Sequence, residues 1–144
     1  MIRDGSIEEV LEIIPQIPEF EHPYGRSEFE ERLNHNKSLI LVSECDKKLQ
    51  GFKCGYERDE TEATFYSWMG GVLPKHRKKG VAYALLREME AWCLQERYSY
   101  LQFKTLNKHK AMLIFAIKSG FEITGLKDST TDPEKRIWLT KKLN

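Results

Sequence analysis

Apolar residues recur along the chain in two patterns, one typical of helices and one typical of strands. Residues 80–97 have helical spacing, since Val81, Leu85 and Met89 share one face while charged residues lie largely elsewhere. Residues 100–105 alternate between apolar and polar side chains, as expected of a half-buried strand. Applied to the whole chain, these criteria predict helices at 7–14, 27–33, 80–97 and 111–118, and strands at 2–3, 38–43, 49–56, 63–72, 100–105, 121–124 and 136–139.

This order of elements predicts an α+β fold. We expect a mixed central sheet of about six to seven strands, flanked by about four helices. No linker-like or repetitive segment interrupts the pattern, so residues 1–144 are expected to form a single domain. A chain of 144 residues is long enough to build one sizeable core.

Local signals mark the starts of the first two predicted helices. Ser6 with Glu9, and Ser27 with Glu30, have the spacing of a capping box, in which a hydroxyl and a carboxylate satisfy free amides at a helix start. Between them, residues 15–26 contain three prolines and are expected to form a loop.

Glycines and polar residues mark other boundaries. Gly70 and Gly71 lie inside a predicted strand, which suggests a bulge or the close approach of another backbone or a ligand. Polar residues at 58–61 and 128–133 predict connections between strands. Gly120 is well placed as the left-handed residue that ends a helix.

Composition narrows the set of partners. The sequence is 40% apolar and 31% charged, with a net charge of +1. We expect no nucleic-acid partner, because binding to backbone phosphates requires an excess of basic residues. We expect no membrane partner either, since apolar runs such as residues 39–42 are too short to span a bilayer. The N-terminal residues lack the pattern of a signal peptide, so a cytoplasmic location is expected.

The cysteines do not suggest a metal site. Cys45, Cys54 and Cys93 are an odd number at unrelated spacings, and the histidines do not cluster with them. We therefore expect free thiols and no metal cofactor.

The segment from Val72 to Ala82 carries most of the chemical information. It follows a predicted strand, contains the basic residues 77–79, and leads through Gly80 into the clearest predicted helix. A helix N-terminus leaves backbone amides without intrahelical partners and carries a partial positive charge. A phosphate placed there gains charge-assisted hydrogen bonds. Because glycine lets the loop wrap closely around an anion, the segment predicts a pyrophosphate site.

A solvated basic turn or a small nucleic-acid patch is the simpler interpretation of the basic residues alone. The ordered combination of a Val-x-Pro strand end, basic residues, Gly80 and Ala82 favours the phosphate site. Its spacing matches neither the Gly-x-Gly-x-x-Gly of dinucleotide-binding folds nor the Gly-Lys-Ser/Thr of nucleoside triphosphate loops.

The pattern Arg77-x-x-Gly80-x-Ala82 resembles the Arg/Gln-x-x-Gly-x-Gly/Ala signature of the GNAT superfamily of N-acetyltransferases. The segment from Asn107 to Phe121, with its final Gly-Phe pair, is similar to the second cofactor helix of that family. The resemblance implies that acetyl-CoA is the co-substrate and that the chain is an acyltransferase.

The resemblance also implies how the cofactor is held. The backbone of Val72 would bond the pantetheine arm, the amides of residues 77–82 would hold the pyrophosphate, and Asn107 would contact the pantetheine. The partner of the 3′-phosphate stays open among Lys78, Lys79, Lys108 and Lys110. The full set of expected cofactor-binding residues is Val72, Leu73, Arg77, Lys78, Lys79, Gly80, Val81, Ala82 and Asn107.

The usual acid of the family is missing. Many members supply a proton to the departing thiolate from a tyrosine four residues before the Gly-Phe pair, and here that position is Ala116. Thiolate is a good leaving group, so the reaction can proceed without an acid, or Ser119, Tyr83 or a water can substitute.

The candidate base is also unusual. Relatives often carry a glutamate on the strand before the loop, and that position is Tyr66, with Glu62 further back on the same face. Tyr66 is therefore the catalytic candidate, orienting a water or the acceptor. Packing in the core between Phe65 and Trp68 explains this tyrosine equally well.

The family's acceptor site lies between the first two helices and the sheet, which here means residues 15–26. Their acids and aromatics suit a cationic amine, although a solvated loop is an equal alternative. From these residues we expect acetyl transfer to the primary amine of a small molecule, a small amine or an amino-acid-like acceptor. A protein or peptide N-terminus is the alternative acceptor, and a non-catalytic acyl-CoA sensor is the alternative function because of Ala116. Trp138 leaves room for a homodimer.

Overall fold

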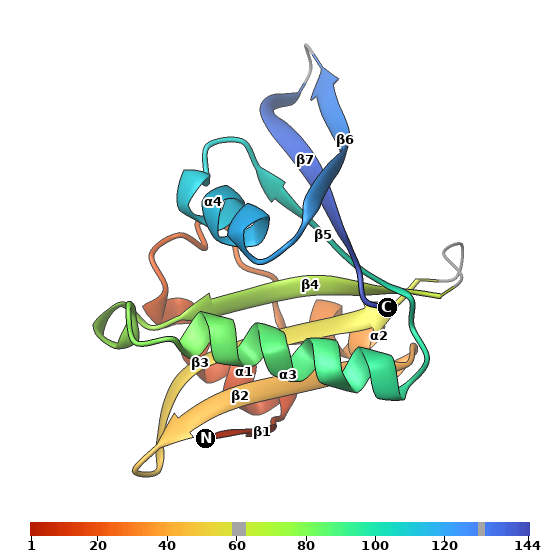
Figure 1. The fold of residues 1–144 in the computed structure, drawn as a ribbon. Helices are drawn as coiled ribbons and strands as arrows, with labels where there is room; N and C mark the ends of the chain where they lie inside the picture. Colours follow the sequence, from red (N-terminus) through yellow and green to blue (C-terminus); the bar gives the residue numbers. More distant parts are fainter. Residues whose placement is uncertain (59–62, 130–131) are drawn as a thin grey trace.

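A seven-stranded mixed sheet organises the computed structural model of the protein, which describes residues 1–58, 63–129 and 132–144 (Figure 1). The strand order is β1-β2-β3-β4-β5-β7-β6, with β4 and β5 parallel and the other neighbours antiparallel. In these residues the strands are β1 Ile2–Asp4, β2 Ser38–Cys45, β3 Lys48–Glu57, β4 Thr64–Val72, β5 Tyr100–Leu106, β6 Glu122–Ser129 and β7 Asp132–Lys142. The helices are α1 Ile7–Ile13, α2 Arg26–Asn34, α3 Val81–Gln95 and α4 Lys110–Lys118, with short 3-10 helices η1 Ile14–Gln16 and η2 Pro74–His76. The predicted fold class is confirmed.

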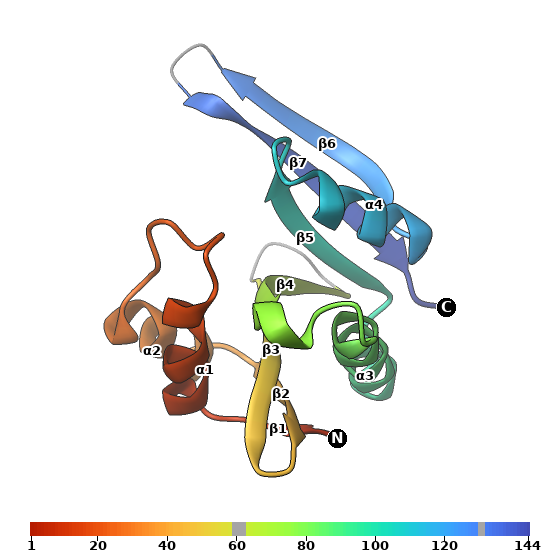
Figure 2. The same ribbon diagram turned by 90° about the vertical axis from the view of Figure 1, so that its left-hand side faces the viewer.

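Helices cover both faces of the β1–β4 part of the sheet. Figure 2 shows α1 and α2 on one side and α3 on the other, while α4 lies beside β5, β6 and β7. Phe65, Met89 and Leu101 are fully buried on the α3 face, and Phe29 and Phe52 are fully buried on the α1–α2 face. Burying a side chain of this kind stabilises the fold by about 1.5–3 kcal/mol. Strand β4, near the middle of the sheet, is therefore held from both sides.

The first two helices begin by different means. The Ser6 hydroxyl accepts a hydrogen bond from the Glu9 N–H at 3.2 Å, and the Glu9 carboxylate accepts one from the Ser6 N–H at 3.1 Å, which confirms the predicted capping box. Helix α2 begins at Arg26, after Gly25 as N-cap, without a side-chain cap. The capping box predicted at Ser27 is wrong, because this residue already lies in the first turn.

Strand β4 contains a bulge, but not at its glycines. The register between β3 and β4 shifts at Trp68, which is the extra residue. Gly70 and Gly71 pair regularly with β3, so the bulge predicted there is wrong. A Cβ at Gly71 would lie 2.6 Å from Ile17 Cδ1. This glycine therefore allows a side chain from the α1–α2 connection to approach the strand.

Strands β4 and β5 separate along their length. Their parallel pairing joins Thr64–Tyr66 to Tyr100–Gln102. Beyond these residues the two strands diverge, as both views show (Figures 1 and 2). Because the bulge at Trp68 bends β4, the second half of this strand has an edge that turns away from β5.

The β6–β7 hairpin is longer than predicted. Most of the polar connection expected at 128–133 belongs to these two strands, and Thr130 and Thr131 lie outside the described residues. Ladder hydrogen bonds hold this hairpin, and they leave no apolar pattern in the sequence. Residues 59–61 of the turn predicted at 58–61 also lie outside the described residues. Gly120 has a φ of 99° and ends α4 as predicted.

The described part of the chain contains no helix with the length and apolar character needed to cross a bilayer. Within the same residues, no group of three or more His, Cys, Asp or Glu side chains is placed to hold a metal ion. The three thiols are free, with Cys45 exposed and the other two buried. Burial raises the pKa of Cys54 and of Cys93 to about 12, so both stay protonated at neutral pH.

Candidate active site

The turn before α3 gathers backbone amides at the helix N-terminus. Lys78 and Gly80 have positive φ angles of 62° and 82°, which curl the chain. The first hydrogen bond of the helix joins the Ala84 N–H to the Gly80 carbonyl at 3.0 Å. The amides of residues 81–83 therefore have no carbonyl acceptor within the helix. Successive amides in such a turn form an anion-binding concavity, and the exposed Lys78 and Lys79 add positive charge beside it.

The second half of β4 presents its backbone to the gap beside β5. The Leu73 N–H donates to the Gln50 carbonyl on the β3 side at 2.9 Å. Neighbouring residues in a strand direct their N–H and C=O groups to opposite sides. The N–H and C=O of Val72 therefore point away from β3, toward the gap. An extended ligand with amide groups can pair with this edge as an added strand.

Arg77 connects the turn to two neighbours. Its Nε donates to the Val72 carbonyl at 3.0 Å, and its terminal nitrogens donate to the two Glu19 carboxylate oxygens at 3.0 and 2.8 Å. This bidentate pair holds the pKa of the Glu19 carboxyl below its usual value and raises the pKa of Arg77. The side chain thus links the turn to the α1–α2 loop and bonds the carbonyl expected to bind pantetheine.

A cleft of about 210 Å³ opens between the α1–α2 loop and the segment that joins β5 to α4. Residues 19–24 form one wall, and Leu106, Lys108 and His109 form the other. Met69, the residue after the bulge in β4, also lines the cleft. The cleft therefore reaches β4 at the Met69 side chain, three residues before Val72.

The loop acids predicted to receive a cationic amine have partners within the protein. Glu19 is bound by Arg77 at 2.8 Å, and Glu21 faces Lys108 across the cleft at 3.6 Å. The negative charge of both carboxylates is therefore balanced locally. Aromatic side chains, Phe20 and Tyr24, remain as the apolar part of this wall.

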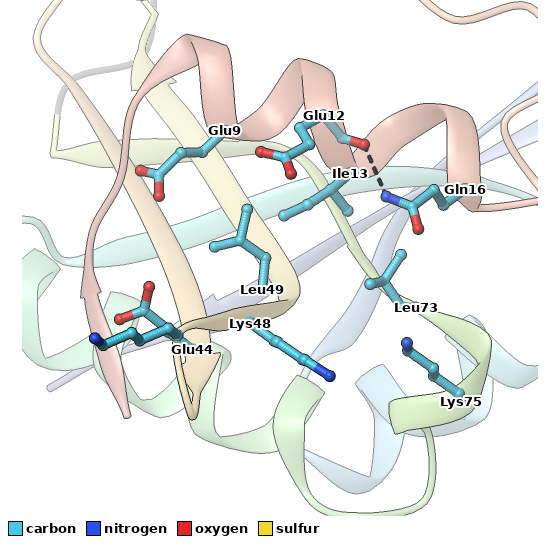
Figure 3. Close-up of a pocket in the computed structure, with 10 residues that line it drawn as sticks. Glu9, Glu12, Ile13, Gln16, Glu44, Lys48, Leu49, Leu73 and Lys75 are labelled. Atoms are coloured by element: carbon cyan, nitrogen blue, oxygen red, sulfur yellow. Dashed lines mark hydrogen bonds between the residues drawn. The ribbon is translucent and has the colours of Figure 1, made fainter.

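A second hollow, of about 350 Å³, lies between α1, the β2–β3 hairpin and η2 (Figure 3). Acidic side chains from α1 and lysines from the hairpin and η2 line it. Glu9 and Glu44 are both bound by Arg3, at 2.6 and 3.0 Å. Of the predicted cofactor residues, Leu73 reaches this hollow. Its lining contains no described residue of β4, whereas the lining of the cleft contains Met69.

Tyr66 lies in a group of aromatic rings. It is 3% exposed, with Tyr56 edge-on at 5.4 Å and Trp138 at 6.0 Å between ring centres. The Arg58 guanidinium lies 5.1 Å from its ring centre. Burial raises the pKa of Tyr66 to about 12, so its phenol is protonated at neutral pH and cannot act as a base there. Glu62, which was expected further back on the same face, lies outside the described residues.

The position of the family's acidic tyrosine is part of the core. Ala116 is 1% exposed and packs among the buried side chains on the α3 face. Of the predicted substitutes, Tyr83 is exposed on the first turn of α3 and Ser119 follows the end of α4.

The β5–α4 segment contributes residues that the sequence did not suggest. No role was predicted at the acceptor site for Leu106 or His109, yet both line the cleft, as does Met69 of β4. Asn107 could have indicated this segment. The resemblance places Asn107 at the pantetheine, so the residues next to it in sequence must lie near the site. The Asn107 N–H donates to the Lys135 carbonyl at 2.7 Å, which fixes this segment against the start of β7.

Residues 7–121 match the model of the acetyltransferase (GNAT) family. The match covers most of the chain, which therefore belongs to this family of enzymes that transfer acetyl groups from acetyl-CoA. A comparison with curated protein sequences gave no match.

Solved structures share the fold at low sequence identity. The ribosomal-protein-S18-alanine N-acetyltransferase from Escherichia coli is 13% identical, with a TM-score of 0.84 over 99% of this chain and 93% of that one. Ard1 from Thermoplasma volcanium is 15% identical, with a TM-score of 0.83 over 99% and 96%. The yncA protein from Salmonella typhimurium, solved with its cofactor acetyl-CoA, is 15% identical, with a TM-score of 0.78 over 100% and 94%.

Proposed function

We propose that this enzyme transfers the acetyl group of acetyl-CoA to the primary amine of a small molecule. The observation that carries the proposal is the cleft of about 210 Å³, which reaches β4 at Met69, three residues before Val72. A concave site with aromatic walls and a few polar groups is typical of small-ligand binding. An amine held there lies next to the strand edge that would present the thioester.

The donor side of the proposal depends on backbone groups. Acetyl-CoA supplies the acetyl group as a thioester. The outward N–H and C=O of Val72 would pair with the pantetheine arm, and the amides of residues 77–82 would hold the pyrophosphate. Asn107 and Leu73 are the remaining residues expected to contact the cofactor. Arg77 would have to release the Val72 carbonyl when the pantetheine arm pairs with it.

The acceptor side of the proposal requires an uncharged amine. In the transfer a C–N bond forms, the C–S bond breaks, coenzyme A leaves with the sulfur, and the amine loses a proton. Histidine is the side chain best suited to take a proton near neutral pH. His109, in the wall of the cleft, is therefore our candidate base, directly or through one water. Tyr66, which stays protonated, would serve as a hydrogen-bond donor instead.

A protein N-terminus is the second candidate acceptor. The structures of two ribosomal-protein alanine N-acetyltransferases, from Escherichia coli and Brucella melitensis, have TM-scores of 0.84 and 0.78 to this chain. A nourseothricin acetyltransferase has a TM-score of 0.66 over 74% of this chain. At 13–19% identity these likenesses concern the fold alone. We favour the small amine because the cleft is small and its loop acids are already paired.

Thiol release from acetyl-CoA tests the proposal. Primary amines of small molecules and short peptides with free N-termini are offered separately, and binding of acetyl-CoA is followed by the change in melting temperature. Release with small amines supports the proposal, and release with peptides alone contradicts it. Stabilisation by acetyl-CoA without release from any acceptor would indicate an acyl-CoA sensor.

A further inference from the structure

A chain of aromatic rings with cations over several of them extends from the acceptor cleft. Ring contacts connect the rings in one chain: Tyr24 lies 5.4 Å from Trp68, Trp68 is 5.9 Å from Tyr56, Tyr56 is 5.4 Å from Tyr66, and Tyr66 is 6.0 Å from Trp138. We call these five residues the aromatic row. Tyr24 also lines the acceptor cleft, so the row begins in the cleft and extends across β4 toward β7.

Arg32 covers the cleft end of this row. Its guanidinium lies 5.1 Å from the ring centre of Tyr24 and 4.7 Å from that of Trp68. Nε donates to Glu28 at 2.7 Å and one terminal nitrogen donates to the Tyr56 hydroxyl at 3.1 Å. Among the described residues, neither of these hydrogen bonds uses the other terminal nitrogen. An arginine stacked on a ring presents its N–H edge in a fixed plane, which suits a carboxylate or phosphate.

Lys104 covers the far end of the row. It pairs with Trp138 across β5 and β7, and its ammonium lies 5.4 Å from the centre of that ring. On β5, Leu101 and Phe103 pack into the α3-side core, so Lys104 and Leu106 share the opposite face. Leu106 lines the cleft. Lys104 is therefore the residue next to Leu106 on this face of β5, beside the acceptor site.

Several cations act on Lys104. Burial lowers its pKa, and the neighbouring charges lower it further. These neighbours are Arg136, Arg58, Arg32 and Lys127. A lysine whose charged form is disfavoured in this way gains more from a bound anion than a solvated lysine does.

We infer that the acceptor is a small amine that also carries an anionic group, and that Lys104 binds this group at the end of the aromatic row, with the positive charge of Arg32 favouring an anion on this surface. The inference depends on the proposed function, since it names the class of small amine. Such an acceptor spans the cleft, with its amine at Met69 and His109 and its anionic end at the cations. The paired carboxylates Glu19 and Glu21 then need not bind the amine as a cation, which agrees with its reacting uncharged.

Four amines test the inference: 4-aminobutyrate, its neutral amide 4-aminobutanamide, 1,4-diaminobutane, and 2-aminoethyl phosphate. The first three share a four-carbon chain and differ in the terminal charge, and the fourth replaces carboxylate by phosphate. From thiol release, we expect kcat/KM for an anionic amine to exceed that for the neutral amide by about tenfold, the value of one charge-assisted hydrogen bond. Preference for the diamine or the amide overturns the inference. Comparison of 4-aminobutyrate with 2-aminoethyl phosphate shows whether the site prefers a carboxylate or a phosphate.

Variants of Lys104 test whether this residue causes the preference for anionic amines. Lys104→Gln is expected to raise KM for the preferred anionic amine by about tenfold and to leave KM for the neutral amide unchanged. Lys104→Arg should restore the preference. Lys118→Gln, the same charge change at the end of α4, is the matched control. An equal effect of both glutamine variants, or of Lys104→Gln on all amines, overturns the inference.

Binding without turnover separates the inference from the proposed function. If acetyl-CoA is bound and no amine releases thiol, small-amine transfer fails as a function. Calorimetric binding of 4-aminobutyrate and 2-aminoethyl phosphate to the wild-type protein and to Lys104→Gln then decides the anion site. Tighter binding to the wild-type protein supports it, and equal or undetectable binding overturns it.

Discussion

The donor and acceptor sides of this enzyme are built in different ways. On the proposed donor side, a short continuous segment supplies the open edge of Val72 and the amides that begin α3, so backbone groups would do the binding. On the acceptor side, side chains from the α1–α2 loop, β4 and the β5–α4 segment meet in one cleft. The donor side can be identified from a local sequence motif, whereas the acceptor side forms only when distant segments come together in the folded chain.

The two sides should therefore respond differently to substitution. Backbone amides have no side chain to remove, so the donor side is sensitive mainly to changes in chain conformation. The acceptor side depends on individual side chains, so single replacements there should change acceptor kinetics while the affinity for acetyl-CoA is retained. Four substitutions, from the largest expected effect to the smallest, test this contrast.

Gly80→Val should have the largest effect and abolish stabilisation by acetyl-CoA. A Cβ at Gly80 would meet no atom within 4 Å, so the residue is required for its φ of 82° and for the open space before the helix amides. The left-handed conformation costs roughly 1–2 kcal/mol for a residue with a side chain. The measurement is the shift in melting temperature with acetyl-CoA, together with the circular dichroism of the free protein.

Gly25→Val is the matched control for Gly80→Val. A Cβ at Gly25 also meets no atom within 4 Å, but its φ is −89°, which any residue adopts. Acetyl-CoA should stabilise this variant as it does the wild type. A folded Gly80→Val protein with unchanged affinity for acetyl-CoA would remove the anion site from the turn before α3.

His109→Gln should have the next largest effect, confined to the acceptor side. Removing a general base lowers the rate by about 10²-fold or more, while binding of acetyl-CoA should be unchanged. The acidic limb of the pH profile of kcat/KM, calculated for the uncharged amine, should disappear, which a merely structural residue would not cause. His35→Gln, at the end of α2, is the control. An unchanged limb in His109→Gln would assign the base elsewhere.

The first two predictions show how unevenly the sequence informs the structure. Periodicity identified the helices and strands, and the Arg77-x-x-Gly80-x-Ala82 pattern identified the turn, because both depend on neighbouring residues. The bulge at Trp68 was misplaced, since it follows from the pairing of β3 with β4 and not from the adjacent glycines. His109 was missed because its partners in the cleft come from distant parts of the chain.

Tyr66→Phe should have a smaller effect. Its pKa of about 12 keeps the phenol protonated throughout the pH range 6–9, so no limb of the rate profile in this range can come from it. We expect kcat/KM to fall by less than about tenfold, the loss of one hydrogen bond, with an unchanged profile. Loss of a limb in Tyr66→Phe, with stability retained, would restore this tyrosine as the base.

Glu19→Gln should have the smallest effect, although this residue joins the two sides. Its ion pair with Arg77 is partly exposed, with 52% and 38% of the side chains accessible, and such pairs contribute about 0.2–1 kcal/mol. The pair holds the pKa of Glu19 below its usual value. Its contribution is therefore complete above the ordinary glutamate pKa and is lost as the pH falls through the lowered one. The difference in melting temperature between wild type and variant should accordingly shrink as the pH is lowered from about 5 to 3.

The same variant measures how far the donor and acceptor sides are coupled. If they are separate, Glu19→Gln should change the affinity for acetyl-CoA by less than about fivefold, since the lost pair contributes at most about 1 kcal/mol. A larger change would mean that the Arg77 side chain, once released from Glu19, alters access to the Val72 carbonyl. The α1–α2 loop would then control entry of the donor as well as contact with the acceptor, and the contrast between a backbone site and a side-chain site would no longer hold at Arg77.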